Sequence, residues 1–189
     1  MMEPQRELFS QAPEIPVEGR LICGIDNGLG GGIVLLSFDR TETSPVKIVM
    51  PTIKLKVGRN MRRYHNEPAL RRIFDRYRPF HVFIEQLAPM PDQAVFSTSN
   101  AGVGHGLIRG ILVGLEIPYT LVHPKTWQAA LFKGMDKGID SKSKALIICH
   151  RLWPGVEWTA SERSRAPHDG LCDAALIGEW GRREFSGHK

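Results

Sequence analysis

One helix near the end of the chain carries two acidic residues on an otherwise apolar face. Residues 167–183 have the spacing of a helix, in which positions three and four apart share a side. Asp169 and Asp173 therefore lie in line with an apolar stripe that runs to Trp180. Carboxylates on a buried face cost free energy unless they are paired or protonated. Either the pair binds a divalent cation together with acids from elsewhere in the chain, or Asp169 caps the helix and Asp173 is solvated at its rim.

Two predicted strands also end on an acid. Residues 21–25 form an apolar run that stops at Asp26, and the strand predicted over 81–86 contains a second run that stops at Glu85. Sites in α/β sheets form where strand ends meet helix ends. Together with the helical pair, these acids make four carboxylates, which are the oxygen ligands that Mg²⁺ prefers and which balance two dications. Two such ions about 3.5–4 Å apart can stabilise both the attacking and the leaving oxygen of a phosphodiester.

The remaining elements predict a mixed α/β sheet with helices on both faces. An antiparallel meander opens the domain, and helices and strands then alternate. We expect further strands over 33–38, 46–50 and 118–122. We expect helices over 68–77, 101–115, 124–132 and 141–152, an exposed basic segment over 54–64 and a loop over 87–100.

One predicted helix carries glycines at intervals of four residues. Each glycine in a helix interior costs about 1 kcal/mol relative to alanine, so the stripe implies that another backbone packs very close. Either the protein's own sheet or a second copy of this helix would serve. The stripe consists of Gly102, Gly106, Gly110 and Gly114.

Composition fits one globular domain. The chain has 189 residues, of which 42% are hydrophobic and 24% charged. We expect a flexible segment over 1–20, one domain over 21–185 and a tail over 186–189. With no long apolar run and no signal-peptide pattern, a cytoplasmic protein without a membrane partner is expected. The three cysteines lack the spacing of a zinc site or a disulfide framework and are predicted to be buried free thiols.

The formal net charge of +5 suits a polyanionic substrate around a small acidic site. A mildly basic charge is also common in proteins that have no such partner, so the charge alone does not decide.

Around the four acids and in several other segments, the sequence resembles the RuvC-type Holliday junction resolvases of the ribonuclease H-like superfamily, in particular the branch found in bacteriophages. The matching segments occur in the same order as in the family and cover nearly all of the chain from Leu21 to Arg183. It is carried by residues 24–28 with 31–33, 82–85, 90–91, 117–119, 122–127, 151–156 and 168–177.

This resemblance implies a five-stranded mixed sheet, a homodimer and an endonuclease that resolves four-way DNA junctions with two Mg²⁺ ions per site, or Mn²⁺ in their place. The positions that match the family's catalytic and metal-binding acids are Asp26, Glu85, Asp169 and Asp173. Possible accessory residues are His168, Lys125, Lys142 and Lys144. The chain departs from the family pattern in the four-residue spacing of its helical acids, in Asn27 where proline is usual, and in Gln128 where lysine is frequent.

The resemblance also indicates how DNA would be held. The loop after Glu85 is where this family reaches the junction centre, so Met90 and Phe96 would act as an apolar wedge between bases; alternatively, Phe96 folds back over the core. Other residues expected to contact DNA are Arg59, Arg62, Arg63, Lys125, Lys133, Arg163 and Arg165.

Three other functions remain open from the sequence. The same chemistry could act on forks, flaps or RNA–DNA hybrids, or the protein could bind junctions without cleaving them. The glycine-rich turn over 28–32 also resembles the phosphate-binding hairpin of actin-like ATPases and sugar kinases. Those proteins need two such domains, whereas this chain has room for about one.

Overall fold

The computed structural model describes residues 20–39, 43–87 and 95–187, with the side chains of 95–100 left out. A five-stranded sheet in the order β3-β2-β1-β6-β7 forms its centre. The first three strands pair antiparallel, whereas β6 and β7 run parallel to β1, so the sheet is mixed. Its strands are β1 (Leu21–Asp26), β2 (Gly32–Ser37), β3 (Val46–Val49), β6 (His81–Glu85) and β7 (Tyr119–Val122).

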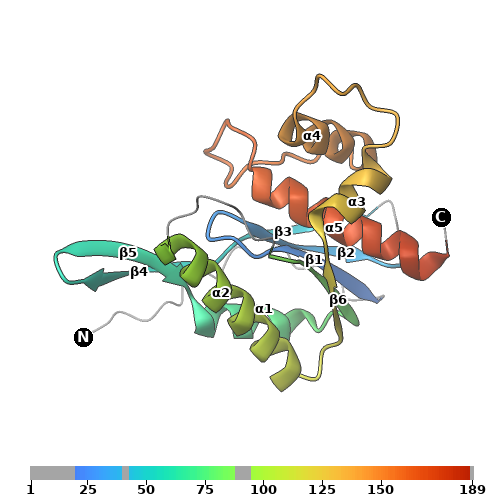
Figure 1. The fold of residues 1–189 in the computed structure, drawn as a ribbon. Helices are drawn as coiled ribbons and strands as arrows, with labels where there is room; N and C mark the ends of the chain where they lie inside the picture. Colours follow the sequence, from blue (N-terminus) through green and yellow to red (C-terminus); the bar gives the residue numbers. More distant parts are fainter. Residues whose placement is uncertain (1–19, 40–42, 88–94, 188–189) are drawn as a thin grey trace.

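Helices cover both faces of this sheet (Figure 1). One hydrophobic core lies between the sheet and the first two helices, and the other lies beneath the last three. These features confirm the predicted α/β fold, a five-stranded mixed sheet with helices on both faces. The helices are α1 (Glu67–Tyr77), α2 (Val95–Gly114), α3 (Pro124–Leu131), α4 (Ser141–Leu152) and α5 (Asp169–Ser186).

Helix α5 and strand β1 pack with their backbones in contact. A Cβ added at Gly24 would overlap the carbonyl oxygen of Ala174 and the backbone of Gly178. The start of α5 is seated in the same way, because a Cβ at Gly170 would overlap the backbone of Gly31. Glycine is therefore required where the helix crosses the sheet, and this close approach sets the position of the helix that carries Asp173.

The segment over 54–64 is exposed as predicted, but it is not irregular. It belongs to a hairpin of β4 (Thr52–Val57) and β5 (Asn60–His65), which projects away from the main sheet (Figure 1). Apolar and basic residues alternate along β4 with the period of a strand, and Gly58 takes the positive φ of 61° in the turn. This alternation is the signal that the sequence reading overlooked.

Helix α2 begins at Val95, six residues before the predicted start, so part of the expected loop over 87–100 is helical. The glycine stripe of α2 does not face the protein's own sheet. A Cβ added at any of its four glycines would meet nothing within 4 Å, and all four are exposed. The interpretation that this stripe packs on the sheet is therefore wrong. Met90 lies outside the described residues, as do residues 1–19.

The other predicted elements agree closely with the structure. Helix α4 has the predicted bounds, α1 begins one residue early, and α5 extends to Ser186. The three cysteines are buried free thiols, as predicted. Within the described residues, no helix is both long and apolar enough to span a bilayer.

Candidate active site

Asp26 and Glu85 lie side by side at the carboxyl ends of two adjacent parallel strands. The register pairs Ile25 of β1 with Ile84 of β6, so the next residue on each strand is one of the two acids. Alternation along a strand gives Glu85 the same face as Phe83, which packs in the core beneath α5. The edge of the sheet therefore presents both carboxylates toward α5.

The first turns of α5 bring the other two predicted acids to this edge. His168 is the N-cap, and its Nδ1 accepts a hydrogen bond from the Leu171 amide at 3.2 Å. The alternative in which Asp169 caps the helix is therefore wrong. Asp169 lies in the first turn and pairs with Lys142 of α4, with 2.7 Å between Oδ2 and Nζ. Asp173 follows one turn later and is half-buried.

The pKa values show that the acids act on one another. The pKa of Glu85 is raised from 4.5 to about 7, first by burial and then by repulsion from Asp26. The pKa of Asp173 is raised from 3.8 to about 7 by burial and by repulsion from Asp26, Glu85 and Asp169, and Lys142 opposes this shift. Burial also raises the pKa of Asp26. All four predicted acids thus share one local field.

This set has the chemistry of a site for hard divalent cations, because its donors are carboxylate oxygens in excess over nearby positive charge. The side chains do not form a closed cage, however. Over the described part of the chain, no three His, Cys, Asp or Glu side chains are gathered closely enough to hold an ion. The repulsion that raises the pKa of Glu85 and of Asp173 nevertheless requires that these carboxylates lie close to Asp26. The donor set of these residues therefore fits a hard divalent metal.

Trp127 supports Glu85 from α3. Its side chain is fully buried, and its indole Nε1 donates a hydrogen bond to Glu85 Oε1 at 3.2 Å. This bond lowers the pKa of Glu85 and so opposes the effect of burial. Trp127 belongs to one of the segments that resemble the family, but its contact with Glu85 has no sequence signal because the two residues are 42 positions apart.

A buried polar network holds the residue that follows Asp26. Asn27 is 4% exposed, and its Nδ2 donates to Nδ1 of His105 on α2 at 2.6 Å. His65 at the end of β5 donates from Nε2 to the Asn27 carbonyl oxygen at 3.0 Å. Burial lowers the pKa of both histidines. Asn27 thus joins the end of β1 to the hairpin and to α2, a role that the sequence did not reveal.

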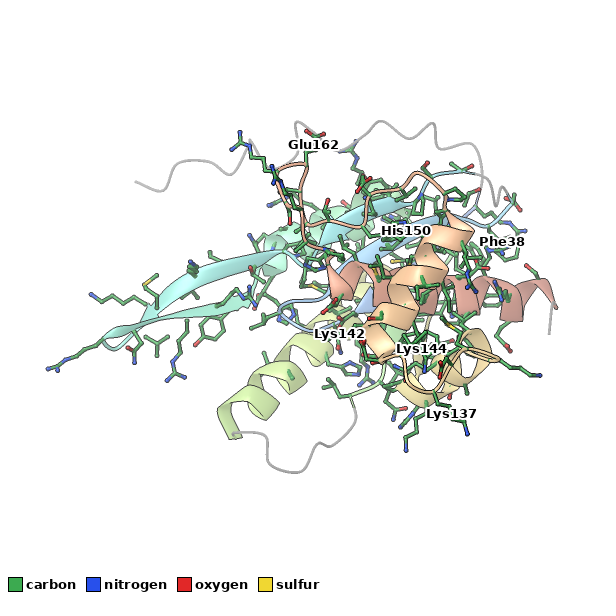
Figure 2. The ribbon with its side chains drawn as sticks, turned by 90° about the horizontal axis from the view of Figure 1, so that it is seen from above. Phe38, Lys137, Lys142, Lys144, His150 and Glu162 are labelled. Atoms are coloured by element: carbon green, nitrogen blue, oxygen red, sulfur yellow. The ribbon has the colours of Figure 1, made fainter. Side chains whose placement is uncertain are left out.

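Only some of the predicted accessory residues reach the acids. Figure 2 shows Lys142 and Lys144 at the start of α4, but only Lys142 pairs with a site acid. Lys125 and Lys133 are exposed at either end of α3, and Arg163 is exposed in the loop before α5. Arg165 is exposed in that same loop, and Arg59, Arg62 and Arg63 lie on the hairpin. Phe96 lies in the first turn of α2, and its side chain is outside the described set.

The fold matches known solved structures, although no family model and no curated protein matches the sequence. Thermus thermophilus RuvC in complex with a Holliday junction substrate is 14% identical, with a TM-score of 0.55 over 89% of this chain and 97% of that one. The same bacterium's RuvC alone is 15% identical, with a TM-score of 0.53 and the same coverage. The yeast mitochondrial Holliday junction resolvase is 13% identical, with a TM-score of 0.55 over 87% of this chain and 78% of that one. The chain has the fold of these resolvases.

Proposed function

We propose that this protein is a metal-dependent, structure-selective DNA endonuclease that resolves four-way junctions by paired phosphodiester hydrolysis. The observation that carries the proposal is the group of half-buried carboxylates Asp26, Glu85 and Asp173, in which Asp26 raises the pKa of Glu85 and both raise the pKa of Asp173. In a fold shared with Holliday junction resolvases, these acids lie at the edge of the sheet beneath the start of α5.

The residues that would hold two Mg²⁺ ions, or Mn²⁺ in their place, are Asp26, Glu85, Asp169 and Asp173. When bound, the metal would supply an activated water and neutralise charge on the phosphate. His168 would approach only through Nε2, because its Nδ1 is occupied in capping α5.

The protein's own groups prepare this site. The Trp127 indole orients Glu85, and the Gly28 amide donates to Asp26 Oδ1 at 3.0 Å. Lys142 holds Asp169 in position and presents a positive charge at the rim, where a phosphate would approach. The exposed cations at the ends of α3 and in the loop before α5 would contact more distant phosphates.

Two copies of the protein would be needed for paired cuts, and α2 offers the surface on which they would meet. Its exposed side carries the glycine stripe with Val103 and Val113, which are 63% and 65% exposed. Glycines lower the stability of a helix, and exposed glycines form no contact within one chain that would offset this cost. Close backbone contact with the α2 of a second copy, packed on the stripe, would offset it.

Cleavage of a defined four-way junction tests the nuclease assignment. We expect the wild-type protein to nick opposing strands symmetrically with Mg²⁺ and not with EDTA. Asp26→Asn, Glu85→Gln and Asp173→Asn should each lose at least about 100-fold in rate, because each removes a negative charge where metal would bind. Glu162→Gln, in the exposed loop before α5, controls for the loss of an acid elsewhere (Figure 2).

Cleavage of a panel of four-way junctions, forks, flaps and RNA–DNA hybrids separates the alternatives. If the protein cuts forks, flaps or hybrids faster than four-way junctions, the proposed chemistry stands but the proposed substrate is wrong. Tight junction binding without nicking in either metal would favour an architectural DNA-binding protein. Cleavage at the wild-type rate by Glu85→Gln would refute the metal assignment.

Sedimentation velocity tests the dimer. Gly110→Leu should shift the protein toward monomer and abolish paired cutting while single nicks persist, because the added side chain separates the two helices. His150→Leu, on the exposed side of α4, is the matched control for added bulk (Figure 2). A wild-type protein that is monomeric even when bound to a junction would refute the proposed interface.

A further inference from the structure

The whole net charge of the chain equals the charge of one hairpin. Strands β4 and β5 with their turn span residues 52–65 and contain five cations and no acid. The chain has 25 Lys and Arg against 20 Asp and Glu, so outside the hairpin the two signs balance. The cations of the hairpin are Lys54, Lys56, Arg59, Arg62 and Arg63.

Three of these cations lie on one side of the ribbon. Lys54 pairs with Arg63 across the two strands, and Lys56 occupies the same side two residues along. All three are exposed. Cations that face each other across a ribbon repel, and a polyanion that spans both relieves this repulsion. The other side carries Arg62 opposite Leu55 and is otherwise mostly apolar; Leu55 and Val57 are 46% and 44% exposed.

The base of the hairpin is anchored beside the candidate active site. His65, the last residue of β5, bonds to the carbonyl of Asn27, which directly follows Asp26. The ring of His65 also packs against Gly104 of α2, where a Cβ would overlap it. The Asn66 amide donates to the Pro51 carbonyl at 2.9 Å and closes the base of the ribbon. The hairpin therefore starts next to Asn27, the residue that follows Asp26, and projects outward (Figure 1).

We propose that the basic side of this hairpin binds the phosphate backbone of the DNA duplex arm that leaves the active site. A strand of six residues reaches about 20 Å, which corresponds to roughly six base pairs of duplex at 3.4 Å each. Residues two apart on a strand are separated by about 6.7 Å. This distance is close to twice the rise of about 3.4 Å per phosphate along one DNA strand. The inference rests on the proposed function, since it takes junction DNA as the ligand.

The test is the salt dependence of junction binding by the full-length protein, measured by fluorescence anisotropy in EDTA to prevent cleavage. The variant Lys54→Gln/Lys56→Gln/Arg63→Gln removes three charges from the basic side. The slope of log K against log salt should fall by about 2.7, since each phosphate contact contributes about 0.9. Affinity at about 0.1 M salt should drop at least about 10-fold. Protection of phosphates about six base pairs from the cut should disappear.

A matched control removes the same charge elsewhere. Arg71→Gln/Arg72→Gln/Arg76→Gln lies on exposed positions of α1 and should leave the slope unchanged. The conservative variant Lys54→Arg/Lys56→Arg should retain the wild-type slope. Cleavage at saturating enzyme should stay within about twofold in the α1 control, because its substitutions are exposed and none lies at the acids.

The outcomes distinguish the two proposals. A wild-type slope in the hairpin triple variant, or an equal loss in the α1 control, would overturn the role of the hairpin and leave the nuclease assignment standing. A wild-type protein that neither binds nor cuts junctions would overturn the proposed function and this inference with it.

Discussion

Replacement of Glu85 by glutamine should stabilise the metal-free protein above neutral pH. The pKa of this carboxyl is about 7 in the folded chain, against an ordinary value of 4.5. The folded state therefore favours the protonated acid. Its contribution to stability is complete below about pH 4.5 and is lost as pH rises through about 7. Glutamine keeps the shape and an oxygen acceptor for Trp127, but it carries no charge at any pH.

The size of the effect follows from the shift. A rise from 4.5 to about 7 corresponds to roughly 3 kcal/mol once the acid is fully ionised. The group is only half-buried and repels Asp26, whose own protonation can adjust, so about 1–3 kcal/mol is expected. At about pH 5 the two proteins should differ by less than about 1 kcal/mol, because wild-type Glu85 is then mostly protonated.

Urea unfolding of both proteins in EDTA, at about pH 5 and about pH 8, measures this difference. The comparison must be between variant and wild type, because His65 and His105 act in the opposite direction. Burial depresses the pKa of both histidines, so their contribution to stability is lost as pH falls. Glu162→Gln supplies the control for an exposed acid.

Divalent metal gives the second arm of the experiment. Mg²⁺ should raise the stability of the wild-type protein at about pH 8, because a ligand of the native state stabilises it by mass action. The same addition should do little for Glu85→Gln. If this variant is no more stable than wild type at about pH 8 in EDTA, Glu85 does not hold a buried charge and the electrostatic reasoning fails.

Two further predictions concern the residues that support the acids. Trp127→Phe should raise the pH of half-maximal cleavage by about one unit, because Glu85 becomes harder to ionise without the indole hydrogen bond. A hydrogen bond to a charged group is worth about 1.5–3 kcal/mol. An unchanged pH profile would count against this role of the indole. Gly24→Ala should destabilise the protein by about 3 kcal/mol or more in thermal unfolding, since its Cβ would overlap the backbone of α5. Gly30→Ala, which meets nothing within 4 Å, should be nearly neutral, and equal losses from the two changes would contradict the backbone contact.

The sequence predicted the elements whose signals are local. The strands that end at Asp26 and Glu85 can be predicted from an apolar run followed by an acid. The parallel pairing of β1 with β6 then places the two acids side by side. Helix α4 has a capping residue, Asp140, whose carboxylate accepts from two amides of the first turn. Such patterns are contained in a dozen residues, so they can be read without tertiary information.

The features that were missed depend on long-range contacts or on ambiguous local patterns. Trp127 reaches Glu85 across 42 positions, and Asn27 reaches His105 across 78, so neither contact has a sequence signature. The hairpin was overlooked because its exposed strands form no core of their own. The start of α2 was placed late because the polar residues of its first turns resemble a loop. The glycine stripe left two partners open, and only the structure showed that it faces away from the sheet.

Because Gly24 and Gly178 allow the backbones of β1 and α5 to touch, these two residues without side chains set the distance in space between Asp26 and Asp173. A bulkier residue at either place would lift the helix from the sheet and separate acids that are themselves intact. A chain of this fold could thus retain every carboxylate and still be inert. The presence of this pair of glycines is consequently a sharper criterion for an active protein than the count of its acids.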